Sequence, residues 1–238
     1  MYRSKTINPH VSLILPVYNE SKRIQTGLKA AISYLEKQPY SWEIIVVDDG
    51  STDVNTSGVA LDSPEVKLIR TTRNFGKGHA IRVGVEASRG EYIIFSDIDF
   101  SVPPEFISPF LTVLKSTDIV IGSRRLRQSH VTQHQHFLRE SLGHGFTQIA
   151  NFILGLHHSD LTCGFKGFKR SVAQDLFRCQ KLNRWAFDPE ILFLAQKLHY
   201  RIHEFPVTWA NDPHTKVNLI NDLPQSLLSL LYIRLMHS

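Results

Sequence analysis

Short apolar runs alternate with amphipathic stretches of helical length through the first half of this 238-residue chain. Strands buried on both faces appear as continuous apolar runs, whereas helices repeat apolar residues every three or four positions. The sequence predicts strands at 11–16, 43–48, 67–70, 92–96 and 118–122, and helices at 21–37, 77–88 and 104–115. Strands that alternate with helices pair in parallel through right-handed crossovers. The pattern therefore predicts an α/β fold with a largely parallel sheet.

The pattern changes after Gly122. Residues 123–135 are polar and basic without clear periodicity, which indicates a mobile loop. Further helices are predicted at 137–154, 189–198 and 223–235, with a strand at 200–207. No linker rich in Pro and Gly divides the chain, and a hydrophobic content of 42% is sufficient for a substantial core. We therefore expect one domain.

Charge and cysteine content restrict the class of protein. The chain has 27 Lys and Arg against 22 Asp and Glu, a net charge of +5, which favours an anionic partner such as a nucleotide or a phospholipid surface. Its two cysteines indicate neither a disulfide framework nor a zinc site, so a reducing compartment is expected. No secretory signal, membrane-spanning run or nucleic-acid motif is recognised in the sequence.

Two carboxylates flank one apolar residue where the fourth predicted strand ends. These are Asp97 and Asp99. Ligands of open α/β sheets bind at the carboxyl ends of the strands. Paired hard oxygen donors there suit Mg²⁺ or Mn²⁺ carrying a diphosphate. Acidic residues at such positions also serve as turn formers or helix caps, so this pair alone does not decide the function.

Polar residues at two other strand ends strengthen the prediction of a ligand site. The first strand ends in the segment 16–20, Pro-Val-Tyr-Asn-Glu, and the second in 48–53, Asp-Asp-Gly-Ser-Thr-Asp. Asp48 or Asp49 is suited to accept hydrogen bonds from a base or a ribose. The segment 74–78, Asn-Phe-Gly-Lys-Gly, opens the next helix with exposed backbone N–H groups and a positive charge. Its spacing matches neither a P-loop nor a dinucleotide fingerprint.

In this order and spacing, the four motifs resemble the GT-A-fold family 2 glycosyltransferases. The polyprenyl-phosphate sugar transferase branch, which includes dolichyl-phosphate β-glucosyltransferases and dolichol-phosphate mannose synthases, is the more similar. Later segments carry the same resemblance: Gly122-Ser-Arg124, Arg139, Asp160-Leu-Thr-Cys-Gly-Phe-Lys166, Arg184-Trp-Ala-Phe-Asp188-Pro-Glu190 and Lys216. The resemblance covers roughly residues 11–217. It implies a single GT-A, Rossmann-like domain with a mixed, mainly parallel central sheet flanked by helices.

The resemblance also implies a division of labour along the chain. Residues 8–122 would form the nucleotide-sugar-binding half, 123–222 the acceptor-binding half, and 223–238 a C-terminal helix suited to association with a membrane. The nucleotide-sugar site is predicted at Pro16, Tyr18, Glu20, Asp48, Asp49, Lys77 and Asp97. Asp97 and Asp99 would hold Mg²⁺ or Mn²⁺, and Arg124, Arg139 and Lys216 the acceptor phosphate. Mannose synthases often have glutamine two residues past the acidic pair, where this chain has Ser101.

The chemistry implied by the resemblance fits these residue types. Attack at the anomeric carbon expels a nucleoside diphosphate, and a metal and fixed cations such as Arg124 stabilise the charge that develops. A phosphate monoester has a second pKa of about 6, so a phosphate acceptor is mostly dianionic at neutral pH and needs little help from a base. If a base acts, the candidates are Asp188 and Asp160, followed by Glu190.

The predicted function is inverting, metal-dependent transfer of a hexose to a polyprenyl phosphate, either dolichyl or undecaprenyl. Glucose from UDP-glucose is the leading donor. Mannosyl transfer from GDP-mannose, a soluble glycan acceptor, and a nucleotide-binding module without turnover are the alternatives. We expect a cytoplasmic protein, peripheral on the cytoplasmic face of a membrane, that binds through the helix at 223–235, the helix beginning at Phe137 and a basic surface.

Overall fold

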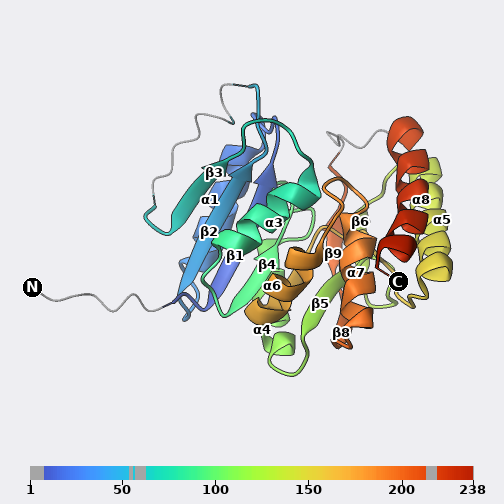
Figure 1. Ribbon diagram of the computed structural model, residues 1–238. Coiled ribbons are helices and arrows are strands. Elements are labelled where there is room, and N and C mark those ends of the chain that lie inside the picture. Colours follow the sequence, from blue (N-terminus) through green and yellow to red (C-terminus); the bar gives the residue numbers. More distant parts are fainter. Residues whose placement is uncertain (1–7, 54–55, 57–62, 213–218, 238) are drawn as a thin grey trace, which may run out of the picture.

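The computed structural model describes residues 8–53, 56, 63–212 and 219–237, and it is built around a seven-stranded sheet with the order β3-β2-β1-β4-β7-β5-β8 (Figure 1). The strands of this sheet are β1 (Val11–Val17), β2 (Trp42–Asp48), β3 (Val66–Arg70), β4 (Tyr92–Phe95), β5 (Ile119–Ser123), β7 (Lys166–Lys169) and β8 (Ile202–Pro206). Neighbouring strands are parallel except at β7, which runs antiparallel to β4 and β5. The predicted α/β class with a mixed, mainly parallel sheet is confirmed.

Helices cover both faces of the sheet. One face packs on α1 (Ile24–Leu35), η1 (Pro104–Phe106) and α4 (Ile107–Leu114). The other packs on α3 (Lys77–Ala87), α5 (Phe137–Leu154), α6 (Arg170–Cys179), α7 (Phe187–Lys197) and α8 (Leu219–Met236). The core consists of two apolar clusters, one on each face of the sheet. Successive side chains of a strand point to opposite faces, so Ile14 of β1 belongs to one cluster and Leu15 to the other. The strands are therefore buried on both sides.

Several elements depart from the sequence prediction. The segment 123–135, predicted as a loop, contains the short strand β6 (His130–Gln133), which pairs in parallel with β9 (Thr208–Ala210) in a separate two-stranded sheet. The sequence prediction also contains neither β7 nor α6. β7 reads Lys-Gly-Phe-Lys, and so short a strand with two charged residues has no apolar run. It becomes a strand because β4 and β5 both offer it hydrogen bonds.

The chain order reverses at β1, which has β2 on one side and β4 on the other. In open α/β sheets such a switch point leaves a crevice at the carboxyl ends of the strands. Pro16 lies in β1, where it lacks an N–H for pairing. The pairing of β1 with β4 stops at Ile14 and Phe95, so Pro16 lies beyond it. The strand ends thus open toward the predicted ligand site.

The two longest helices, α5 and α8, lie away from β1, β2 and β3 (Figure 1). α5 and α8 contact each other and run along one edge of the molecule (Figure 1). α5 begins and ends where the sequence predicts, and its end at Gly155 follows from the left-handed backbone there, with φ of 67°. No helix in the described part of the chain has the length and apolar character needed to cross a membrane.

Candidate active site

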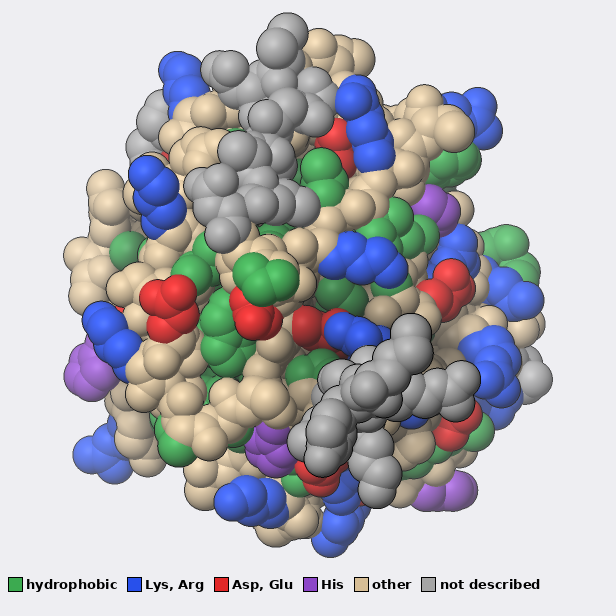
Figure 2. Space-filling view, turned by 90° about the vertical axis from the view of Figure 1, so that its left-hand side faces the viewer, with side chains coloured by type: hydrophobic (Ala, Val, Ile, Leu, Met, Phe, Trp, Pro, Cys, Tyr) green, Lys and Arg blue, Asp and Glu red, His purple; other side chains and the backbone are tan. Residues whose placement is uncertain are grey.

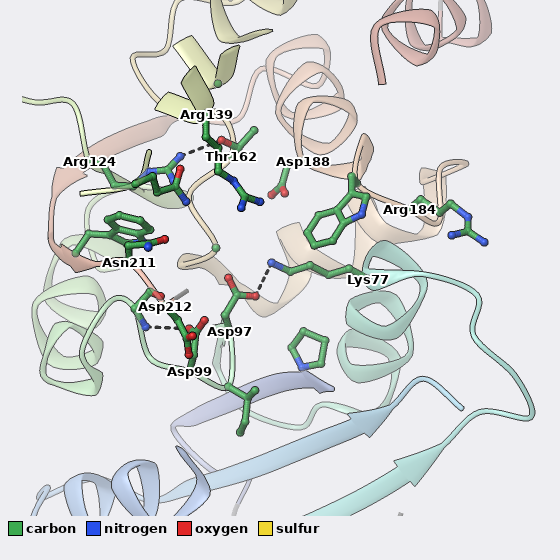
Figure 3. A pocket seen from close by; sticks show the side chains of 18 of the residues that line it. Lys77, Asp97, Asp99, Arg124, Arg139, Thr162, Arg184, Asp188, Asn211 and Asp212 are labelled. Atoms are coloured by element: carbon green, nitrogen blue, oxygen red, sulfur yellow. Dashed lines mark hydrogen bonds and ion pairs between the residues drawn. The ribbon is translucent and has the colours of Figure 1, made fainter. Parts of the chain in front are cut away.

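A cavity of about 840 Å³ lies at the carboxyl ends of β1 and β4 (Figure 3). It brings together most of the predicted site residues, which come from both halves of the chain: Pro16, Tyr18, Glu20, Asp49, Lys77, Asp97, Asp99, Arg124, Arg139 and Asp188. Asp48, Asp160 and Glu190 are not among its lining residues, and Lys216 lies outside the described residues. Acidic and basic side chains lie next to each other across the centre of one face of the molecule (Figure 2).

The loops after β1 and β2 are joined through Asn19. Its backbone has a positive φ of 51°, a conformation that asparagine adopts more readily than most residues. The Asn19 side-chain oxygen accepts a hydrogen bond from Thr52 N at 2.8 Å, and Asn19 N donates to Ser51 Oγ at 2.8 Å. Glu20 N donates to Thr56 Oγ1 at 2.7 Å. These bonds fix two of the predicted motifs against each other.

The two neighbouring aspartates after β2 occupy different environments. Asp48 is fully buried, and its Oδ1 accepts a hydrogen bond from Ser51 N at 2.8 Å, so it shapes the turn beneath the cavity. Asp49 lines the cavity, and its Oδ2 accepts hydrogen bonds from Gly76 N at 2.6 Å and Phe75 N at 3.0 Å. Asp49 therefore also fixes the loop that leads into α3. Gly76, with φ of 114°, has a conformation that favours glycine.

Each member of the acidic pair after β4 has its own cation. Asp97 Oδ1 lies 2.5 Å from Lys77 Nζ, and this aspartate is the more exposed of the two. Asp99 Oδ1 accepts a hydrogen bond from Ser101 N at 3.0 Å, while its Oδ2 lies 3.4 Å from Arg23 Nη1. Burial, reinforced by the charge of Asp97, raises the pKa of Asp99. Burial opposes the charge on Lys77, but the nearby carboxylates outweigh it and raise the pKa of Lys77.

Arg23 links three parts of the site. Its guanidinium donates to both carboxylate oxygens of Glu20, at 2.6 and 2.8 Å, to Asp212 Oδ2 at 3.0 Å, and to Asp99 Oδ2 at 3.4 Å. The sequence prediction includes neither Arg23 nor Asp212. A positive side chain at the N-terminus of a helix is unfavourable next to the helix dipole. The position of Arg23 at the start of α1 was therefore the one feature of the sequence that could have indicated a role in the site. Asp212 follows β9, a strand that was itself missed.

Arg124 forms the opposite wall of the cavity with a buried carboxylate behind it. Arg124 Nε and Nη2 donate to Asp160 Oδ2 and Oδ1 at 2.6 and 2.8 Å, and the guanidinium lies over the Trp209 ring at 5.4 Å. Asp160 is fully buried. Burial alone would raise the pKa of Asp160, but the charge and hydrogen bonds of Arg124 outweigh it and hold that pKa well below its usual range. Asp160 therefore orients Arg124 and stays ionised.

A second buried ion pair lies deeper in the site. Lys166, from β7, donates to Asp188 Oδ1 at 2.5 Å and to the Cys163 carbonyl oxygen at 2.7 Å. Asp188 lines the cavity near Arg139 and Lys77 (Figure 3). Burial raises the pKa of Asp188, although Lys166 and Lys77 oppose this shift. Glu190 instead accepts hydrogen bonds from Lys181 N and Leu182 N, so it stabilises the chain segment before α7.

Close packing holds the acidic pair in place. A Cβ added at Gly27 in α1 would lie 2.0 Å from the carbonyl oxygen of Ile98, the residue between Asp97 and Asp99. We expect Gly27→Ala to lower the free energy of unfolding by about 1–3 kcal/mol, the usual cost of overpacking, and to reduce catalytic activity. Urea unfolding and a transfer assay measure the two effects.

Gly145 provides the matched control, because no heavy atom lies within 4 Å of a Cβ built there. Gly145→Ala lies inside α5 and should leave activity unchanged while stabilising the helix by up to about 1 kcal/mol. Equal effects of the two substitutions would contradict the packing argument.

Comparison with known proteins shows the family of this chain. The model of the family described as Glycosyl transferase family 2 matches residues 12–177. Dolichyl-phosphate beta-glucosyltransferase ALG5C of Trichomonas vaginalis is 36% identical over 226 residues, which cover 88% of this chain and 66% of that protein. Dolichyl-phosphate beta-glucosyltransferase of Mus musculus is 36% identical over 244 residues, covering 94% of this chain and 75% of that protein. The chain thus spans about two thirds to three quarters of the length of these relatives.

A solved structure shares the fold. Glucosyl-3-phosphoglycerate synthase from Mycobacterium tuberculosis, in complex with Mn²⁺, uridine diphosphate and glucosyl-3-phosphoglycerate, has a TM-score of 0.66 and 19% sequence identity, with 95% of this chain and 80% of that chain covered. The match extends over nearly all of the chain. By the family match and by its relatives, the protein is a glycosyltransferase that belongs to glycosyl transferase family 2.

Proposed function

We propose that the protein transfers glucose from UDP-glucose to a polyprenyl phosphate with inversion at the anomeric carbon. One observation carries this proposal: a single cavity has the acidic pair Asp97 and Asp99 on one wall and Arg124 and Arg139 on another. A sugar nucleotide with a cation suits the first wall, and a phosphate acceptor suits the second. The names of the relatives, dolichyl-phosphate beta-glucosyltransferases, support this choice of donor sugar and acceptor.

The donor half is proposed to lie at the ends of β1, β2 and β4. Pro16, Tyr18, Glu20 and Asp49 line the cavity and would hold the nucleoside. Asp48 would act from below, by shaping the turn that presents Asp49. Lys77 lies on Asp97 and would contact the diphosphate, since its pKa is raised and it stays positively charged.

Asp97 and Asp99 fit a divalent cation. Both line the cavity, both offer only hard oxygen atoms, and both are already matched to positive charge from Lys77 and Arg23. Mg²⁺ commonly uses one or two carboxylates together with substrate phosphates and water, so the pair is sufficient. We propose that it holds Mg²⁺ or Mn²⁺. When bound, the ion supplies positive charge at the diphosphate, where negative charge develops.

Arg124 and Arg139 would bind the acceptor phosphate. An oxygen of that phosphate attacks the anomeric carbon, the bond from this carbon to the nucleoside diphosphate breaks, and its electron pair leaves with the diphosphate. The ion pair with Asp160 and its two hydrogen bonds hold Arg124 in one orientation, so Arg124 needs little rearrangement during the reaction. Lys216 stays a prediction for the same role.

Of the three carboxylates considered as a base, Asp188 is the one we propose. It lines the cavity, and burial raises its pKa, which favours proton uptake from a singly protonated acceptor phosphate. Asp160 is held ionised by Arg124, and Glu190 is used by the segment before α7. A dianionic acceptor would react without any base, so Asp188 matters most below a pH of about 6.

The proposed division of the chain follows the origin of these residues. Residues 8–122 supply the donor side and 123–222 supply the acceptor side. The C-terminal helix predicted in 223–238 is α8, which begins earlier, at Leu219, and ends at Met236. Because a polyprenyl phosphate is held in a bilayer, we also propose that the protein works as a peripheral protein on the cytoplasmic face of a membrane.

An assay with purified components tests this function. The protein is incubated with Mg²⁺ or Mn²⁺, labelled UDP-glucose or GDP-mannose, and a short-chain polyprenyl phosphate in detergent. We expect lipid-linked glucose from UDP-glucose. Removal of the ion with EDTA should abolish the product, and addition of the ion should restore it. The absence of lipid-linked product from every donor would contradict the proposal, and product from GDP-mannose alone would replace glucose with mannose.

A further inference from the structure

Exposed large apolar side chains are concentrated on two helices. Of the twelve such residues in the described part of the chain, five lie on α5 and five on α8: Phe137, Leu138, Leu142, Ile149 and Phe152, and Leu228, Leu231, Tyr232, Leu235 and Met236. Single exposed apolar residues are ordinary on a protein surface, but a concentration of this kind marks an interaction site. The two helices contact each other and lie side by side (Figure 1).

The exposed residues of α5 follow the period of the helix. Leu138, Leu142, Ile149 and Phe152 are spaced by four, seven and three positions, so they form one stripe along the helix. The opposite side of α5 is buried in the core through Phe146, Ala150 and Leu154. α5 is therefore apolar on two sides, although a helix at the surface of a domain needs only one.

α8 has the same organisation. Leu230 and Ile233 are buried in the core, while Leu228, Leu231 and Leu235 are 70%, 53% and 76% exposed. Burial of the first set anchors α8 to the domain. The second set is spaced by three and four positions and contributes nothing to the core, so these side chains form an exposed apolar stripe that is suited to a partner.

The surroundings of these stripes are basic. The loop before α5 contains the exposed Arg127, and α5 itself contains Arg139 and one acidic residue, Glu140. Arg234 lies among the exposed apolar residues of α8. Apolar side chains bordered by positive charge match an anionic lipid surface, where the former enter the acyl boundary and the latter face the head groups.

The stripes are continuous with the cavity. Leu142 and Arg139 of α5 and Ser226 of α8 line the cavity as well as belonging to these two helices. A molecule with a phosphate near Arg139 and a long apolar tail would extend from the cavity along α5. The geometry points to the exposed stripes of α5 and α8, which we call the docking face, as the surface that lies on an anionic bilayer. This inference rests on the proposed function for the identity of the acceptor, but not for lipid binding itself.

Vesicle flotation tests the docking face directly. The protein is mixed with phosphatidylcholine vesicles that contain or lack phosphatidylserine, without donor or acceptor. We expect binding to the anionic vesicles, and a reduction of at least about tenfold in the partition constant for the double variant Leu138→Gln/Phe152→Gln, since both side chains would lose burial in the membrane. Neither residue lines the cavity. Leu198→Gln, at an exposed residue outside the docking face, should bind as the unmodified protein does.

Three outcomes would overturn the inference. The first is failure of the unmodified protein to float with anionic vesicles, and the second is equal flotation of the double variant. The third is a dimer in sedimentation experiments without lipid that the double variant abolishes, because the docking face would then join two copies of the chain. Transfer to a short-chain acceptor in detergent should be unchanged in the double variant, so a failure of the proposed function is recognised separately from a failure of lipid docking.

Discussion

Replacing Asp99 with asparagine should reduce sugar transfer at least about a thousandfold and leave the protein no less stable. The first effect follows because a metal ligand at the diphosphate contributes several kcal/mol of charge stabilisation, and each 1.36 kcal/mol is a factor of ten in rate. The second follows because burial and Asp97 raise the pKa of Asp99, so the ionised carboxylate opposes folding at neutral pH. Asparagine removes this charge and keeps the oxygen that accepts from Ser101 N.

The measurements are kcat/KM with saturating Mg²⁺ and the midpoint of urea unfolding. Asp118→Asn is the matched control. Like Asp99, Asp118 is paired with basic side chains, here Lys169 and Arg201, but it lies outside the cavity. It should retain full activity. Normal activity of Asp99→Asn would rule out the proposed ion site, and a large loss of its stability would show that Asp99 serves the fold instead.

Replacing Arg124 with methionine should lower the free energy of unfolding by about 3–5 kcal/mol, which is the usual effect of removing one partner of a buried ion pair. Asp160 is fully buried and would lose the guanidinium that accounts for its ionisation, so it would either remain as an unpaired buried charge or take up a proton on folding. The double variant Arg124→Met/Asp160→Asn should recover part of this stability, since no charge is then buried. Both variants should lack transfer activity, because both lack the proposed acceptor-binding cation.

The pH dependence gives an independent check on the pair. The pKa of Asp160 is lowered in the folded protein, so its contribution to stability is fully present above the unfolded value of about 3.9 and is lost as the pH falls below it. Stability of the unmodified protein and of Arg124→Met should therefore converge below a pH of about 4. Arg201→Met, at an exposed ion pair, should cost less than about 1 kcal/mol. A similar cost for Arg124→Met would show that Asp160 does not depend on Arg124.

The sequence predicts the elements whose reasons are local. β1, β2 and β4 are continuous apolar runs, and α5 has a periodic pattern with Gly155 at its end. β7 could not be found this way, because Lys166 and Lys169 are polar and four residues carry no period. Lys166 is buried only because Asp188, 22 residues later in the chain, neutralises it. Such a strand depends on tertiary contacts that no local pattern contains.

The candidate site also has features that the sequence predicts and features that depend on tertiary contacts. Motifs at strand ends predicted residues that line one cavity, since parallel strands bring their carboxyl ends together. The ion pairs among these residues were not predictable. Arg23 contacts Asp99 and Asp212, which lie 76 and 189 positions away in the sequence. Asp160 contacts Arg124 from a segment 36 positions later, just before β7, which runs antiparallel to β5. The sequence shows which residues are chemically suited to the site, and the fold decides which of them face the substrate.

The position of β7 has a consequence for how the protein is made. β7 pairs with β4 on one side and β5 on the other, yet it follows both in the chain. During synthesis, β4 and β5 leave the ribosome with open edges that are filled only after Lys169 has followed. Open strand edges invite pairing between chains. The sheet formed by the first half of the chain is therefore completed only by a strand from the second half, and newly made chains are expected to be most prone to aggregation before β7 has been synthesised.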